Sequence, residues 1–212
     1  MGHKIIVAGI GPGGDDFISP AARHAIDHAK ILVGGRRALS QFAADDRLTF
    51  PITADIDAAV DFIRSNVERD DVTVMVSGDP GYYSLLDTLR REFDPSIIEV
   101  IPSISAMQLA FARAKMPWHD ATLLSFHGRR PPDAELFYAP HRVLGLLTDG
   151  SFHSQSISKI LLALGWAPDT KIFIALRLSY PDEQLIEMTL GEAAGRDPIK
   201  HCVLIVGGGD DD

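Results

Sequence analysis

The sequence predicts an α/β protein with two domains, an N-terminal domain with a mostly parallel sheet and a C-terminal domain with a mixed sheet. In the first half, short apolar runs alternate with segments that repeat apolar residues at helical spacing. Runs that are apolar along their whole length are typical of strands covered on both faces, as in a parallel sheet. Near residues 114–133 prolines break this alternation, and the strand-like runs that follow have few helices between them.

The N-terminal elements can be placed in order along the chain. Strands are expected at residues 4–10, 31–34, 72–77 and 97–101, and helices at residues 20–29, 56–68 and 84–93. The first helix has the clearest start, because Ser19 is a typical N-cap and Pro20 suits the first helical position.

The C-terminal half predicts one helix, in "SISKILLALG", among several strand-like runs. The segment "ALRLSYPDEQLIEMTL" predicts a hairpin with "SYPDE" as its turn. We expect domains over residues 1–116 and 120–209, joined by a linker at 117–119. Ligands of such proteins usually lie between the domains, at the carboxyl ends of the strands, so we expect a ligand cleft there.

Composition excludes several classes of function. The 212 residues carry a formal net charge of -9, which argues against nucleic-acid binding. No apolar run approaches the roughly 18 residues of a membrane span, so we expect no membrane-spanning segment. The start "MGHKIIV" enters a strand-like run at once, so we expect no signal peptide. A single cysteine, Cys202, lies in an apolar run; we expect it to be buried and the protein to be cytoplasmic.

The first loop contains Gly9, Gly11 and Gly14 in a G-x-G-x-x-G pattern after an apolar strand. In a dinucleotide-binding loop the helix begins within the glycines, so that its N-terminus faces the pyrophosphate. Here the helix begins five residues later, and the carboxylates of Asp15 and Asp16 would repel a diphosphate. A plain glycine turn, or a loop that lets the backbone approach an uncharged or cationic ligand, remains open.

Two further turns follow core strands. Ser77-Gly78-Asp79-Pro80 places a carboxylate at a strand end, as either a ligand contact or an Asx-type turn. Residues 102–106, "PSISA", form a turn of small residues that would let a ligand lie close to the backbone.

These three turns, with "GIGPG" first, "GDP" second and "PSISA" third, resemble the tetrapyrrole methylase family, the class III S-adenosylmethionine-dependent methyltransferases. "ILVGGRRAL", "VSGDPGYYSLL", "PSISAMQLAFAR" and "SFHGR" are similar to the members that act on precorrin-6Y or cobalt-precorrin-7. The resemblance implies an enzyme that transfers methyl from S-adenosylmethionine to C5 of a corrin precursor in cobalamin biosynthesis, leaving S-adenosylhomocysteine. It also implies a homodimer, and in some organisms fusion to a C15-methylating decarboxylase module.

The resemblance assigns a cofactor role to residues in both halves. Carried over by motif, they are Gly11, Pro12, Gly13, Ser77, Gly78, Asp79, Tyr82, Ser105, Ala106, Leu147, Thr148, Ala175, Leu176 and Arg177. Asp79 would orient the reacting groups rather than act as a nucleophile.

A carboxylated corrin precursor would explain two basic clusters in an acidic chain, since arginine suits bidentate carboxylate contacts. The first cluster is Arg36 and Arg37; the second is His127, Arg129 and Arg130. His127 is a candidate for removing the ring proton. Each cluster has the alternative of a solvated surface turn, and His127 that of a structural histidine.

Other functions stay open from the sequence alone. They are methylation of a different tetrapyrrole position or of a different substrate, a nicotinamide-dependent oxidoreductase, and a carrier that binds a tetrapyrrole or a nucleotide without turnover. We expect no metal site in the chain itself, because any cobalt would arrive inside the substrate.

Overall fold

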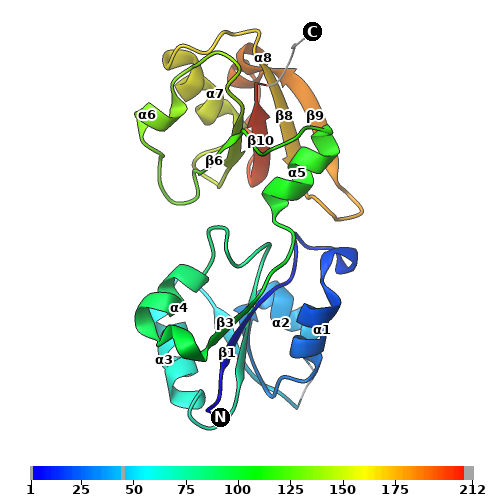
Figure 1. Ribbon diagram of the computed structural model, residues 1–212. Coiled ribbons are helices and arrows are strands. Elements are labelled where there is room, and N and C mark those ends of the chain that lie inside the picture. Colours follow the sequence, from blue (N-terminus) through cyan, green and yellow to red (C-terminus); the bar gives the residue numbers. More distant parts are fainter. Residues whose placement is uncertain (1, 44–45, 208–212) are drawn as a thin grey trace. The chain divides into compact units, whose positions relative to one another are not determined.

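The computed structural model describes residues 2–43 and 46–207, which form two compact α/β units (Figure 1). The predicted fold class is confirmed. The units divide between Ser105 and Ala106, before the expected linker at 117–119. The reason is helix α5 (Ala106–Ala114), which packs on strands of the second sheet, where Met107 lies against Gly145.

The first unit holds a five-stranded sheet in the order β3-β2-β4-β1-β5, with every pair parallel. Its strands are β1 (Ile5–Gly9), β2 (Ile31–Gly35), β3 (Leu48–Ile52), β4 (Val72–Val76) and β5 (Ile98–Ile101). Strand β4 is buried along its whole length, because it lies in the middle of the sheet. All carboxyl ends of a parallel sheet meet at one edge, so the loops after β1, β4 and β5 lie together.

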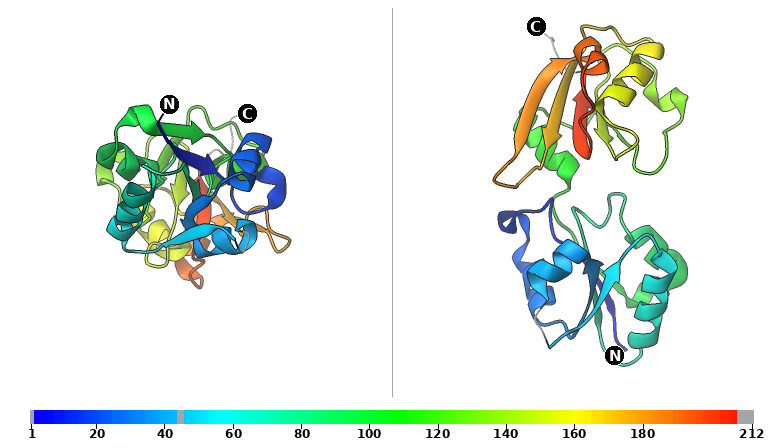
Figure 2. Two further views of the ribbon diagram at one scale, coloured as in Figure 1. Left: turned by 90° about the horizontal axis from the view of Figure 1, so that it is seen from below. Right: turned by 180° about the vertical axis from the view of Figure 1, so that it is seen from behind.

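Helices cover both faces of this sheet (Figure 2). On one face pack α1 (Pro20–Asp27) and α2 (Arg36–Phe42), through Ala22, Ile26 and Ala38. On the other face pack α3 (Ile56–Asn66) and α4 (Leu86–Glu92), through Ile63 and Leu89. Short 3-10 turns at Asp15–Phe17 and Pro95–Ile97 complete the unit.

The second unit holds a mixed sheet in the order β6-β7-β10-β8-β9. Its strands are β6 (Thr122–Ser125), β7 (Leu144–Leu147), β8 (Lys171–Leu176), β9 (Gln184–Thr189) and β10 (Cys202–Val206). Only β6 and β7 pair in parallel. The expected hairpin is confirmed as β8 and β9, which pair antiparallel around a loop at residues 177–183.

Three further helices belong to the second unit: α6 (Asp133–Leu136), α7 (Ser154–Ala163) and α8 (Leu190–Gly195). Helix α7 packs on the sheet through Ile157 and Leu161. Trp166 lies in the same core and donates its indole N–H to the Leu136 carbonyl at 2.8 Å. No helix within residues 2–43 and 46–207 combines the length and the apolar character needed to cross a membrane.

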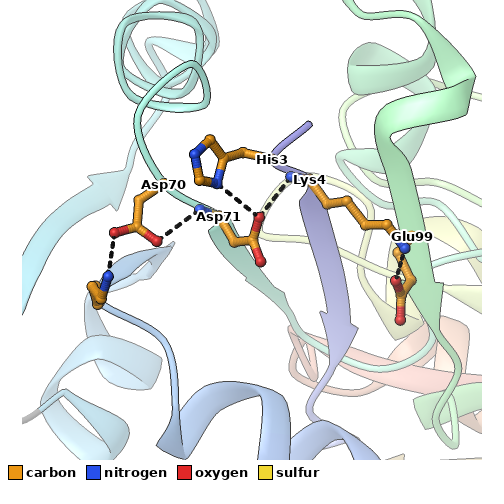
Figure 3. A network of polar contacts seen from close by, with 6 residues as sticks. His3, Lys4, Asp70, Asp71 and Glu99 are labelled. Atoms are coloured by element: carbon orange, nitrogen blue, oxygen red, sulfur yellow. Dashed lines mark hydrogen bonds and ion pairs between the residues drawn. The ribbon is translucent and has the colours of Figure 1, made fainter. Parts of the chain in front are cut away.

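Ion pairs tie the strands of the first unit together at the amino-terminal edge of its sheet (Figure 3). Lys4, just before β1, donates its backbone N–H to Asp71 and its Nζ to Glu99 on β5, both at 2.8 Å. Lys30, just before β2, pairs with Asp70 at 2.7 Å. These contacts lie at the opposite end of the strands from the loops after β1, β4 and β5.

Candidate functional site

Gly9 marks the point where the three loops of the first unit converge. A Cβ atom there would lie 2.7 Å from Ser103 Cβ, 2.8 Å from the Gly78 carbonyl and 2.8 Å from Pro80 Cδ. Real Cβ atoms do not come so close to other heavy atoms, so only glycine lets the loops after β1, β4 and β5 meet.

Gly11 and Gly78 join the first two of these loops through their backbones. The Gly78 N–H donates to the Gly11 carbonyl at 2.8 Å, and both residues have φ of +71°. That left-handed conformation favours glycine. Pro12 and Gly13 follow, half-buried, and Gly13 has φ of +153°.

The helix after the first loop begins where the sequence predicts. Ser19 caps α1 by accepting the Ala22 N–H at 3.1 Å, and Pro20 is its first residue. The glycines therefore lie outside the helix. Asp15 instead forms an exposed contact with Arg23 at 3.8 Å. This arrangement does not favour the dinucleotide alternative.

Asp79 holds two loops together with its carboxylate. One oxygen, Oδ1, accepts the Gly81 N–H at 2.8 Å, and the other, Oδ2, accepts the Ser103 N–H at 2.9 Å. The second bond crosses from the loop after β4 to the loop after β5. Both oxygens are engaged by the backbone, so the side chain acts as a brace for these loops.

Tyr82 carries a buried hydroxyl at the same edge. Its Oη has no hydrogen-bond partner among the described residues, and burial raises the pKa of the phenol well above its ordinary value. The neighbouring Tyr83 is 49% exposed and packs edge-on against the Tyr82 ring, with centroids 4.9 Å apart. A buried hydroxyl without a partner costs about 1–3 kcal/mol, which a polar ligand atom would recover.

The other predicted cofactor residues near this edge differ in exposure. Ser77 is exposed directly after β4, whereas Ser105 is 5% exposed at the end of the turn after β5. Ala106 begins α5. The structure thus brings Gly11, Ser77–Asp79, Tyr82 and the turn ending at Ser105 to one edge of the first sheet.

Arg36 and Arg37 are the first two residues of α2, directly after β2, and both are exposed. They lie on the same carboxyl edge of the sheet, because β2 is parallel to β4. A substrate role for them stays a prediction.

In the second unit, the predicted cofactor residues Leu147 and Thr148 lie at the end of β7. The Thr148 hydroxyl donates to the Cys202 carbonyl and accepts the Cys202 N–H, each at 2.8 Å. Thr148 is buried by this pairing, which extends the sheet. Cys202 is buried as predicted, and burial raises the pKa of its thiol to about 11.

The basic loop, which we define as residues 127–130, follows β6. His127, Arg129 and Arg130 are exposed, and the His127 N–H donates to Ser125 Oγ at 3.2 Å. Arg130 pairs with Asp133 at the start of α6. Strand β6 is parallel to β7, so the basic loop lies at the same edge as Thr148.

Asp149, which the sequence analysis did not single out, connects the basic loop to the loop after β7. Its Oδ2 accepts the Gly128 N–H at 2.8 Å. Its Oδ1 accepts the Ser151 and Phe152 N–H groups at 2.7 and 2.6 Å. Backbone hydrogen bonds hold the pKa of Asp149 below its usual value, and the bond from Gly128 is the largest cause. The signal for it was an Asp-Gly pair directly after a strand.

The last predicted cofactor residues lie on the hairpin. Ala175 is buried and Leu176 half-buried in β8, whereas Arg177 is exposed just beyond the strand. The Arg177 side chain pairs with Asp182 at 2.6 Å and lies over the Tyr180 ring at 4.7 Å. Both partners of Arg177 lie in the loop between β8 and β9, so its side chain helps to order that loop.

The described residues contain no group of three or more histidine, cysteine or acidic side chains placed to hold a metal ion. One histidine pair escaped the sequence analysis. His24 and His28 are four residues apart on α1, with ring centroids 4.1 Å apart. The His28 Nδ1 already bonds the His24 carbonyl at 2.9 Å.

The chain is similar to several known proteins. The chain is 37% identical over 161 residues to the cobalt-precorrin-7 C(5)-methyltransferase of Salmonella typhimurium, covering 76% of this chain and 79% of the relative. It is 28% identical over 198 residues to the probable enzyme of that name from Methanocaldococcus jannaschii, covering 91% and 92%. It is 30% identical to the decarboxylating precorrin-6Y C(5,15)-methyltransferase of a Sinorhizobium species, covering 76% of this chain but 39% of the relative.

Solved structures show the same fold. The precorrin-6Y methylase of Archaeoglobus fulgidus matches with a TM-score of 0.73 at 23% identity, covering 97% of this chain and 98% of that one. The uroporphyrin-III C-methyltransferase of Thermus thermophilus, solved with S-adenosylhomocysteine, matches with a TM-score of 0.74 at 20% identity, covering 96% and 92%. The family profile of the tetrapyrrole (corrin/porphyrin) methylases matches residues 4–194. The chain therefore belongs to the tetrapyrrole methylase family.

Proposed function

We propose that this enzyme transfers a methyl group from S-adenosylmethionine to C5 of a cobalt-precorrin-7 type ring in cobalamin biosynthesis. The observation that carries the proposal is the 37% identity over 161 residues to a cobalt-precorrin-7 C(5)-methyltransferase. The precorrin-6Y enzyme from Sinorhizobium supports the same ring position.

The loops of the first unit fit a cofactor of this kind. Gly9 lets the loops after β1, β4 and β5 pack against one another, and Gly11 lets the first loop fold back onto Phe17, so that these loops are held together at one end of the sheet. The buried Tyr82 hydroxyl lacks a partner among the described residues and can serve a polar ligand atom. When bound, S-adenosylmethionine supplies an activated methyl group on a sulfonium.

The residues of the chain act mainly by positioning in this proposal. Asp79 keeps the loops in place, because both its oxygens accept backbone N–H groups. A carboxylate engaged in this way orients the cofactor loops and does not move a proton. Holding the reacting atoms in line lowers the barrier without further acid or base catalysis.

The basic loop supplies the groups for the substrate. Arg129 and His127 are exposed at the carboxyl edge of β6, where an acidic ligand can reach them. We assign Arg129 and Arg130, with Arg36 and Arg37, to the carboxylates of the ring substituents. His127 is the candidate base for the ring proton. Its side chain lies near enough to Asp149 to contribute, after the backbone hydrogen bonds, to the lowered pKa of that acid.

We further propose that the enzyme is a cytoplasmic homodimer and that it works beside a C15-methylating decarboxylase. The second reaction is supported by the Sinorhizobium enzyme, whose name joins both reactions and whose chain is much longer than the matched region. The homodimer rests on the family resemblance, and the cytoplasmic location on the single, buried cysteine.

Calorimetric titration with S-adenosylhomocysteine, with NAD as the control ligand, tests the cofactor. We expect S-adenosylhomocysteine to bind and NAD to produce no heat of binding. Binding of NAD alone would contradict the proposal. Turnover is then tested with cobalt-containing and cobalt-free precorrin-7 in parallel, and the absence of methylated product from both would refute the C5 assignment.

A further inference from the structure

Asp149 is the only described acid whose carboxylate joins the basic loop to another loop. Its two oxygens accept three backbone N–H groups, one from Gly128 and two from the segment that leads into α7. The Asp149 N–H in turn donates to the Phe152 carbonyl at 2.9 Å. The acid is therefore fixed in its own loop through one oxygen and reaches the basic loop with the other.

The basic loop has few other constraints. Gly128 adopts φ of +73°, and a Cβ there would meet nothing within 4 Å, so packing does not hold this residue. The His127 N–H bonds Ser125 within the same strand end. Arg130 contacts Asp133, three residues further along the chain. Of these contacts, only the one from Asp149 reaches across to a different strand.

We propose that Asp149 is a positioning residue that holds the basic loop in the conformation in which Arg129 and its neighbours bind the carboxylates of the substrate. The inference rests on the proposed function for the identity of that substrate. Asp149 does not contact the substrate itself, because its oxygens are directed at backbone N–H groups. It acts on the second unit as Asp79 acts on the first, by joining the loops that follow two strands of one sheet.

The bond between Asp149 and Gly128, which we call the tether, is tested by limited digestion with trypsin in the absence of substrate. The bond between Arg129 and Arg130 lies in the basic loop, and the next arginine bond precedes Pro131, which protects it. We expect Asp149→Ala to be cut at Arg129 about tenfold faster than the wild type. Asp94→Ala is the matched control, because Asp94 also accepts a backbone N–H, from Ser96, but in the first unit.

Kinetics test whether the tether serves the substrate. We expect Asp149→Ala to lower kcat/KM for the corrin substrate about tenfold, mainly through KM, with S-adenosylhomocysteine affinity unchanged. The double variant Arg129→Ala/Asp149→Ala should lose less than the sum of the two single losses, because Arg129 contributes little once the loop is free.

Asp149→Asn keeps the test possible if the alanine variant fails to fold. Its amide oxygen can still accept from Ser151 and Phe152, while its NH2 group cannot accept from Gly128. The proposal is overturned if cutting at Arg129 is unchanged, if cutting rises while kcat/KM does not fall, or if the two losses simply add. A wild type that makes no methylated product would refute the proposed function, whereas the trypsin result would still decide the tether.

Discussion

In each unit one aspartate joins two of the loops that follow the strands. Asp79 joins the loops after β4 and β5, and Asp149 joins those after β6 and β7. An aspartate is suited to this task because its short side chain can accept two or more backbone N–H groups. These acids therefore act through the loops they hold.

Asp79→Ala should weaken S-adenosylhomocysteine binding about tenfold, because it leaves the Ser103 and Gly81 N–H groups without their acceptor and frees both loops. Calorimetric titration measures the affinity. Asp94→Ala removes a similar local bond outside the site and should bind as the wild type does. An unchanged affinity in Asp79→Ala would remove this acid from the site.

Gly9→Ala should lower the free energy of unfolding by about 1–3 kcal/mol, because its Cβ would overlap with Ser103 and Gly78. Urea denaturation measures the loss. Gly35→Ala is the control, since a Cβ at Gly35 meets nothing within 4 Å. Equal stability of the two variants would show that the loops do not converge on Gly9.

At the scale of elements, the sequence predicts those with strong local signals. The first helix is placed correctly because Ser19 and Pro20 mark its start. Strand β3 is missed because it is the outermost strand of its sheet. Its partly exposed residues, with Pro51 among them, do not form an apolar run. Helix α2 is also missed, because it begins directly after β2 with no turn between the two elements. The Asp-Gly pair at Asp149 marks a turn in the sequence, but its bond to Gly128 could not be predicted, since that bond depends on the pairing of β6 with β7.

The amino-terminal ion pairs join elements that are distant in sequence, and salt should weaken them. Lys4→Met removes the bond from β1 to Glu99 and should lower Tm slightly at low ionic strength. In about 1 M NaCl the difference from the wild type should vanish, because the pair is exposed and screened. A difference that persists in high salt would assign the effect to packing of the lysine stem.

The ion pairs of Asp70 and Lys4 make the stability of the first unit depend on pH in opposite directions. The Lys30 hydrogen bond holds the pKa of Asp70 below its usual value, so its stabilisation is present above the unfolded pKa and is lost as pH falls through the lowered one. The Glu99 hydrogen bond raises the pKa of Lys4, so its stabilisation is lost only as pH rises through the raised value.

At the scale of the whole molecule, the chain forms two units, each with its own hydrophobic core. The first unit gathers glycine loops and Asp79 at one edge of a parallel sheet, and the second gathers the basic loop and Thr148 at one edge of a mixed sheet. The chain is acidic overall, with a formal charge of -9, so the exposed arginines of the basic loop form a local excess of positive charge.

The most direct test of the central claim is to follow a ¹³C-labelled methyl group from S-adenosylmethionine into the corrin precursor by NMR. We predict one new labelled methyl signal per ring, with couplings that place it on C5, and an equal amount of S-adenosylhomocysteine. Label at another ring carbon, or consumption of neither reactant, would contradict it.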